Sequence, residues 1–348
     1  MPFTVGVSIS GANGHLLSMA ATAAERAERL GFDSIEFAES AHDPFLACAI
    51  AAEHTSRIQI HTSVAIAFPR SPMITAMLAW DLQHFSKGRF VLGLGTQVKA
   101  HSERRFSVPW TPPAPRIREY VLAMRTAWRT FQEGVPLRFE GEHYRLSLMN
   151  ANFNPGPIEH PVIPVELAAV NPNNAAVAGE VCSGIKLHPL HTAGYLRDVL
   201  LPAVHRGQAR PATERRTFNV RGGGLIGSGA TPGELDRAAA DVRRWIAFYG
   251  STRAYEPIFE QLNEHDLGAR LRSLAGAGRW AEMPAAVPDG LVEGIGVVAP
   301  YDALADALRS RYDGLVDHIA FNDEFFAKAD DATLAMVVSQ LHAERPSR

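Results

Sequence analysis

The sequence predicts an α/β protein built as a (β/α)8 TIM barrel, and two observations carry that prediction. Short β-branched or apolar stretches alternate with stretches of helical spacing, and the alternation occurs eight times. In the first unit a strand at 3–9 precedes a helix at 16–30, and Gly31 follows as a helix-ending glycine. Strand–helix alternation implies parallel pairing, and eight units favour closure into a barrel. A doubly wound open sheet is the alternative.

The other units follow from the same two periodicities, with proline at the first turn marking helix starts such as the one at Pro72. The predicted strands are 3–9, 34–38, 58–66, 89–95, 163–170, 184–188, 217–226 and 316–322. The predicted helices are 16–30, 44–54, 72–85, 116–131, 172–179, 194–206, 232–248 and 331–343.

Three segments interrupt this rhythm, at about 99–115, 138–162 and 250–290, so the insertions follow the fourth and seventh strands. Loops of this length in a compact domain are usually functional. We therefore expect a single barrel domain over 1–348, with the insertions over the barrel mouth.

Composition excludes several classes of protein. The chain of 348 residues is 46% hydrophobic with a net charge of −3, which gives no basic surface for nucleic acid or membrane. No apolar run approaches the ~20 residues of a membrane-spanning helix. The N-terminus lacks the positive charge of a secretion signal, and two cysteines make no disulfide framework. We expect a cytoplasmic protein with a small-molecule substrate.

Chemistry in such barrels is carried by residues at the carboxyl ends of the strands. Glu39 follows the second strand, Gln97 follows the fourth, and His188 ends the sixth. Carboxylates and imidazoles are the groups that exchange protons with substrates, so Glu39 or His188 is the expected proton-transfer group, with Gln97 as a hydrogen-bond partner.

A metal site is not expected at this mouth. His188 and His191 have a suitable spacing only on a helix, and Pro189 breaks helical geometry between them. Small residues at the ends of the fourth, fifth and seventh strands would let a flat ligand approach the backbone closely. The pattern favours an organic cofactor over side-chain chemistry alone.

Five motifs, in this order and at these spacings, carry a resemblance that spans nearly the whole chain. They are LGFDS at 30–34, AHDPF at 41–45, FPRSP at 68–72, SKGRFVLGLG at 86–95 and ERRF at 103–106. In these motifs the chain resembles the luciferase-like monooxygenase superfamily, in particular its F420-dependent oxidoreductases.

The resemblance implies a luciferase-like barrel that holds the deazaflavin coenzyme F420, or alternatively FMN, in its mouth. It implies a cis peptide bond between Ser63 and Val64 in the third strand, supporting the tricyclic ring. It also implies that many such enzymes are homodimers. The residues it assigns to the ring and its side chain are Glu39, Ser63, Val64, Gly95 and Thr96. Those it assigns to the phosphodiester are Ala168, Ala169, Val170, Asn171 and Asn173, through backbone amides at a helix N-terminus.

The chain departs from the family pattern in two places. Asn171 stands where relatives tend to have glycine, and asparagine is among the residues that best tolerate a left-handed backbone. Ser40 and Thr96 occupy positions where some F420 dehydrogenases carry an acid/base pair.

The sequence thus predicts an F420-dependent oxidoreductase that transfers a hydride between the deazaflavin C5 and a small organic substrate. An FMN-dependent monooxygenase is one alternative. The other is a barrel that has lost its redox cofactor and binds, or converts without oxidation, a substrate in the old pocket.

Overall fold

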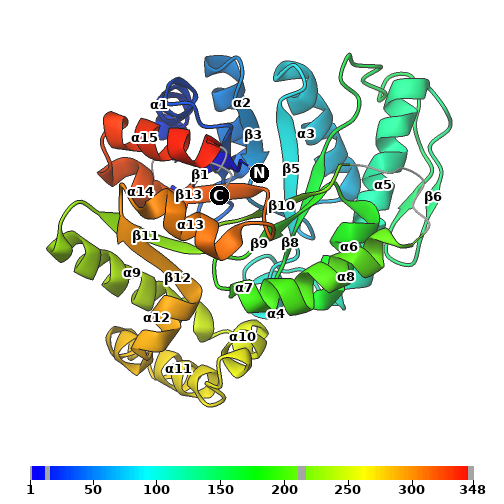
Figure 1. The fold of residues 1–348 in the computed structure, drawn as a ribbon. Helices are drawn as coiled ribbons and strands as arrows, with labels where there is room; N and C mark the ends of the chain where they lie inside the picture. Colours follow the sequence, from blue (N-terminus) through cyan, green and yellow to red (C-terminus); the bar gives the residue numbers. More distant parts are fainter. Residues whose placement is uncertain (1, 12–15, 211–216, 344–348) are drawn as a thin grey trace.

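The computed structural model, which describes residues 2–11, 16–210 and 217–343, confirms the predicted barrel (Figure 1). Its parallel strands run in the order β3-β2-β1-β13-β10-β9-β8-β5, and β3 pairs with β5 to close the ring. Their bounds are β1 Thr4–Ile9, β2 Ser34–Phe37, β3 Gln59–Thr62, β5 Phe90–Gly95, β8 Val165–Ala169, β9 Gly184–Leu187, β10 Asn219–Gly222 and β13 His318–Asn322. A further short strand, β4 (Ala65–Ile66), continues β3 and also pairs with β5.

Helices surround the barrel, and most lie where the sequence predicts them. Their bounds are α1 Leu16–Arg29, α2 Pro44–His54, α3 Pro72–Phe85, α5 Pro113–Glu133, α6 Pro172–Val181, α8 Leu201–Gln208, α13 Leu304–Tyr312, α14 Asp323–Lys328 and α15 Asp331–His342. None of the helices in the described part of the chain combines the length and apolar character needed to cross a membrane.

Several helices start with the same signal, a capping side chain followed by proline. Asp43, Ser71, Asn171 and Thr231 each accept a hydrogen bond from a first-turn amide, and proline is the next residue. The first three of these helices follow barrel strands, so their caps lie on the side of the barrel where the strands end. Local sequence therefore fixes where the chain turns away from the rim.

The predicted strand 217–226 is wrong as a single element, because the chain breaks after β10. Gly223 and Gly224 have φ values of +126° and +70°, and a Cβ at Gly224 would collide with the Tyr312 hydroxyl. The chain then leaves the barrel as β11 (Leu225–Gly229), which pairs in parallel with β12 (Gly296–Pro300), a strand that the sequence did not predict.

The segment between β11 and β12 forms a lobe beside the barrel, which we call the excursion (225–300; Figure 1). It contains α9 Pro232–Gly250, α10 Glu256–Gln261, α11 Leu267–Gly276 and α12 Asp289–Ile295. The predicted helix 232–248 belongs to this lobe, while α13 packs against α15 in the barrel's outer layer.

The expectation that 138–162 covers the mouth is wrong. Its hairpin, β6 (Phe139–Glu140) with β7 (Arg145–Leu146), lies outside α5, where Glu119 accepts the amides of Glu142 and His143 at 3.0 and 2.8 Å (Figure 1). Further along, the Trp80 indole of α3 donates to the Gly156 carbonyl at 3.1 Å. These backbone groups find partners on the outer helices, so the segment runs along them.

A charged network fills the lower barrel interior. Lys186 Nζ lies 2.8 Å from Glu36 Oε2, and Arg221 Nε lies 2.6 Å from Glu166 Oε1. Burial alone would raise the pKa of both carboxyls. Lys186 outweighs burial at Glu36, and Arg221 together with Lys186 outweighs it at Glu166, so both pKa values lie well below the usual range. Two buried anions thus face two buried cations.

Two histidines beside this network stay neutral. Burial, helped by the charge of Arg221, lowers the pKa of His61 to about 3 and that of His318 to about 4. The network therefore carries no net charge near neutral pH, and this balance makes its burial tolerable.

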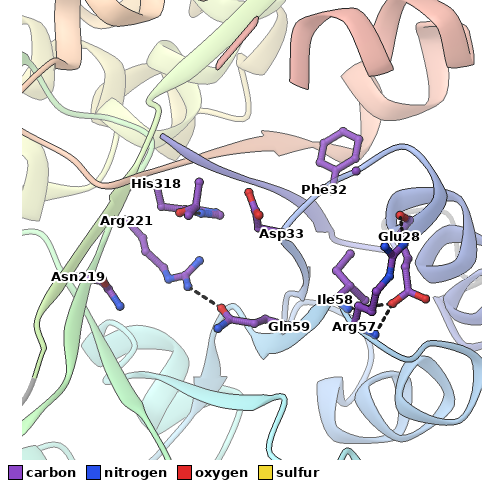
Figure 2. Close-up of a pocket in the computed structure, with 11 residues that line it drawn as sticks. Glu28, Phe32, Asp33, Arg57, Ile58, Gln59, Asn219, Arg221 and His318 are labelled. Carbon is purple, nitrogen blue, oxygen red and sulfur yellow. Dashed lines mark hydrogen bonds between the residues drawn. The ribbon is translucent and has the colours of Figure 1, made fainter. Parts of the chain in front are cut away.

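The network opens into a cavity of about 540 Å³ on the face opposite the mouth (Figure 2). Thr4, Gln59, Asn219 and His318, which line it, each begin their strands. In Figure 2 Arg221 reaches toward Gln59, and its Nη2 donates to Gln59 Oε1 at 3.2 Å. The cavity thus lies at the amino ends of the strands, away from the expected site of chemistry.

We predict that Arg221→Met lowers the free energy of unfolding by roughly 3–5 kcal/mol, because Glu166 stays buried after its partner cation is removed. Arg57→Met is the matched control, since Arg57 lines the same cavity but is exposed, and it should change stability by less than about 0.5 kcal/mol. Urea unfolding followed by circular dichroism measures both. Equal losses in the two variants would contradict the role given to the network.

Candidate cofactor and substrate site

The sequence-predicted site residues gather at one end of the barrel because parallel strands all end on the same rim. Glu39 lies beyond β2, Gln97 beyond β5, Asn171 beyond β8 and His188 beyond β9. Helix α4 (Lys99–Arg104), together with α7 (Ala193–Tyr195) and α10, lies at this end, the lower edge of the barrel in Figure 1. We call this end the mouth.

The third strand is interrupted where the resemblance implies. The peptide bond between Ser63 and Val64 is cis, and it separates β3 from β4. Thr62 Oγ1 donates to the Gly93 carbonyl at 2.7 Å and accepts the Gly93 amide at 2.9 Å. We call this interruption at Ser63 and Val64 the bulge. A Cβ at Gly95 would collide with Val64 Cγ2, so the absence of a side chain at Gly95 lets the bulge lie against β5.

Glu39 clamps this bulge. Its Oε2 accepts the Ile66 amide at 2.7 Å and Arg70 Nη1 at 2.8 Å, while Oε1 accepts Arg70 Nη2 at 3.0 Å. Arg70 also donates to Asp43 at 2.7 Å. Burial would lower the pKa of Arg70, but its bonds to Glu39 and Asp43 outweigh burial and raise it. Both oxygens of Glu39 are therefore engaged by a permanent cation and a backbone amide.

Arg70 is the residue to which sequence reasoning assigned no role. It lies inside the FPRSP motif, between two prolines that fix the turn after β4. The motif contains Arg70, but its partner Glu39 lies 31 residues away in the sequence, beyond the end of another strand. Spacing alone did not identify that pair.

Asn171 occupies the amides that the resemblance assigns to a phosphodiester. Its backbone is extended, with φ −122° and ψ 159°, rather than left-handed. Its side chain accepts the amides of Asn173 and Asn174, each at 3.1 Å, and its carbonyl accepts that of Ala175. Pro172 has no N–H. The first turn of α6 therefore has its amides satisfied from within.

The neighbouring strand ends are joined to this loop. Asn174 Nδ2 donates to Thr96 Oγ1 at 3.4 Å, which links α6 to the end of β5. Gln97 has a left-handed backbone, with φ of 59°, and its Oε1 accepts the amide of Val98 at 2.9 Å. Across the loop, the Tyr195 hydroxyl donates to the Val170 carbonyl at 3.2 Å. Thr96, Gln97 and Val170 are thus held in place at the rim.

His188 is half-buried at the end of β9, and β8 separates that strand from β5, which carries Gln97. Its Nδ1 accepts the Leu190 amide at 3.1 Å. Burial, together with the neighbouring His191, lowers the pKa of His188 to about 3. The ring is therefore neutral near pH 7.

A group of three residues that could ligate a metal lies away from the mouth. In the described part of the chain it comprises Glu119, Glu142 and His143, at the outer hairpin. Glu119 already accepts the backbone amides of the other two residues, so its carboxylate has a structural role there.

A family described as luciferase-like monooxygenase matches residues 3–318. The chain is 44% identical over 313 residues to Uncharacterized protein Rv1360 of Mycobacterium tuberculosis, which covers 90% of this chain and 92% of that protein. It is 28% identical over 293 residues to the Putative coenzyme F420-dependent oxidoreductase Rv3520c of the same species, covering 79% and 82%.

Solved structures share the fold at lower identity. The coenzyme F420 dependent tetrahydromethanopterin reductase from Methanopyrus kandleri superposes with a TM-score of 0.80 at 18% identity, covering 98% of each chain. An F420-dependent secondary alcohol dehydrogenase with an F420-acetone adduct gives 0.75 at 16%, also over 98% of each. The oxygenating part of a Pseudomonas putida 3,6-diketocamphane monooxygenase, in complex with FMN, gives 0.65 at 16% over 98% of each.

We predict opposite effects for two substitutions at Asn171. Asn171→Gly frees two amides of α6 and should leave the affinity for F420 unchanged or improve it, at a cost of a few tenths of a kcal/mol in stability. Asn171→Asp keeps the cap but adds a negative charge, and should weaken F420 binding about tenfold or more. Fluorescence quenching of F420 measures both. A large loss in the glycine variant, or none in the aspartate variant, would remove the phosphodiester from this loop.

Proposed function

Since the chain belongs to the luciferase-like monooxygenase family, we propose that it is an F420-dependent oxidoreductase. It would transfer a hydride between the deazaflavin C5 and a small organic substrate. The observation that carries this proposal is the bulge between β3 and β4, which Glu39 holds against β5, on a chain whose relatives include a protein named as F420-dependent.

The bulge provides a rigid support for a flat ring. Ser63, Val64 and Gly95 meet at the bulge, and Thr96 continues from it along the rim. We assign these residues to the ring of the deazaflavin, which when bound supplies or accepts the hydride. The phosphodiester would lie near Ala168, Ala169 and Asn173, where the side chain of Asn171 has to turn away from the α6 amides.

The contacts of the three candidate catalytic residues favour positioning roles. Glu39 holds the bulge through Arg70 and the Ile66 amide, so we assign it to orienting the cofactor rather than to moving a proton. His188 is neutral and offers a hydrogen-bond donor. Gln97 fixes the turn that follows β5. Orientation of reacting groups is the protein's main contribution in enzymes whose cofactor carries the chemistry.

Two alternatives each have an observation in their favour. An FMN-dependent monooxygenase is supported by the family description and by the structural likeness to an FMN complex. A barrel that has lost its redox cofactor is supported by Asn171, which occupies the α6 amides, and by Ser40 and Thr96 at the acid/base positions of some F420 dehydrogenases. A homodimer is part of the proposal in all three cases.

Side-by-side titration of the purified chain with F420, reduced F420 and FMN decides among these functions. We expect F420 and its reduced form to bind, and FMN to bind at least tenfold more weakly. Preferred binding of FMN would favour the monooxygenase. Binding of none of the three would favour the barrel without a redox cofactor.

We predict that Glu39→Gln lowers stability by roughly 1–3 kcal/mol, because it removes the charge that pairs with Arg70. It should weaken F420 binding while leaving the turnover of the saturated enzyme and its pH profile nearly unchanged. Asp43→Asn is the matched control, because it keeps the cap of α2 and loses only the more exposed bond to Arg70. It should cost less than about 1 kcal/mol.

Unfolding curves, F420 titrations and initial rates with reduced F420 test this pair of variants. If Glu39→Gln abolishes turnover without changing stability or affinity, Glu39 transfers a proton and the positioning role is wrong.

A further inference from the structure

The excursion places two tyrosine rings against His188. The centroids of the Tyr249 and Tyr255 rings lie 4.5 and 4.6 Å from that of His188. Tyr249 is stacked in turn on Trp245, at 5.3 Å and an interplanar angle of 20°. One wall of the mouth beside β9 is therefore aromatic, and residues between β11 and β12 supply most of it.

A bond at the other end of this wall ties the excursion to the barrel. The Thr192 hydroxyl, just beyond β9, donates to Gln261 Oε1 of α10 at 2.7 Å. Gly194 lies directly against the side chain of Gln261, so the loop after β9 and α10 remain close together beyond Thr192. His188 and its two tyrosines are therefore held between two anchored segments.

The hydrogen bond at Nδ1 fixes the tautomer of His188. An amide N–H can only donate, so the Leu190 amide requires an Nδ1 without a proton. The neutral ring then carries its proton on Nε2. The described residues provide no acceptor for this Nε2–H, which makes it the one ring group of His188 left for a ligand.

The side chains of this wall are uncharged near neutral pH. Burial raises the pKa of Tyr249, with a further contribution from Asp323, and burial raises the pKa of Tyr255 as well. His188 is neutral for the reason given above. A neutral hydrogen-bond donor between aromatic rings suits an uncharged acceptor. An anionic ligand buried here would find no cation among the side chains of the wall.

We propose that His188, Tyr249 and Tyr255 form a substrate subsite for a flat, uncharged carbonyl compound or the corresponding alcohol, whose oxygen accepts the His188 Nε2–H. The inference rests on the proposed function and deepens it by naming the substrate class. His188 is a positioning and specificity residue in this scheme, and the excursion supplies the surface that selects the substrate.

Three probes of nearly the same shape test the subsite. Acetophenone offers a neutral carbonyl oxygen, α-methylstyrene replaces that oxygen with a methylene group, and benzoate replaces the acetyl group with a charged carboxylate. Calorimetric titration of the full chain should give acetophenone about tenfold tighter binding than α-methylstyrene, because only acetophenone accepts the hydrogen bond. Benzoate should bind more weakly than acetophenone.

Two variants separate the donor from the ring. His188→Phe keeps an aromatic ring without the donor, and should reduce the preference for acetophenone over α-methylstyrene to about one. His188→Gln keeps an N–H donor and should retain a preference. Absence of acetophenone binding, tighter binding of benzoate, or a preference unchanged in His188→Phe overturns the proposal.

Nitrogen NMR of the chain labelled in its histidines gives a readout independent of turnover. The signals lost in His188→Gln identify His188, and they should show a neutral ring protonated on Nε2 from about pH 8 to pH 5. His191, Tyr249 and Tyr255 face this ring and are the groups whose ionisation it could report. A proton on Nδ1, or titration near the ordinary histidine pKa of about 6.5, overturns the proposal.

The titrations are run with and without oxidised F420, so that the two proposals fail separately. Failure of F420 to bind counts against the oxidoreductase, while the selectivity among the three probes without F420 reports on His188 alone.

Discussion

The barrel is closed by a strand that has to satisfy two partners in two different registers. β3 pairs with β2 and with the start of β5, while β4 pairs with the end of β5. The backbone between them cannot continue the ladder, so another group must fix it. Glu39 does this from the end of β2, and Arg70 holds Glu39 in turn. The shape of the mouth therefore depends on one carboxylate that reaches across from a neighbouring strand.

The lower barrel interior and the aromatic wall of the mouth differ in the charge of their side chains. Glu36, Glu166, Lys186 and Arg221 balance one another inside the lower barrel, next to the cavity in Figure 2. At the mouth, the donors on the aromatic wall are uncharged. A charged interior held by paired groups is rigid, because moving one member would leave its partner buried and unpaired. The rim residues are thus supported from below by a network that resists rearrangement.

Periodicity was sufficient to predict the barrel, since each strand and most helices carry their own signal. It failed where the decisive partner is distant in sequence. The pairing of Glu36 and Glu166 with Lys186 and Arg221 was missed, because single charged residues inside apolar strands show no pattern until the strands are adjacent. The strand predicted at 217–226 was too long, because Gly223 and Gly224 resemble residues of a small-residue strand but turn the chain after β10.

The candidate site was predicted in part, and the reasons differ by residue. The resemblance to a family located the bulge at Ser63 and Val64. It could do so because the bulge is a local feature of the backbone between β3 and β4. The state of the α6 amides was not predicted, since Asn171 was interpreted through its tolerance of a left-handed backbone, whereas its backbone is extended and its side chain caps the helix. The tautomer of His188 follows from an amide two residues away, but its aromatic neighbours come from the excursion, far along the chain.

The part of the chain that contains the excursion leaves the barrel at β10 and returns at β13, and these two strands are neighbours. Gly222 pairs with Ile319 just before the departure, and Gly223 lies against Ala320, on the strand that the chain forms after its return. A segment with neighbouring end points can grow, shrink or be exchanged without shifting any ladder of the barrel. A change in the length or sequence of this segment can thus alter the surface that it presents beside the mouth, while the pairing of the barrel strands stays the same.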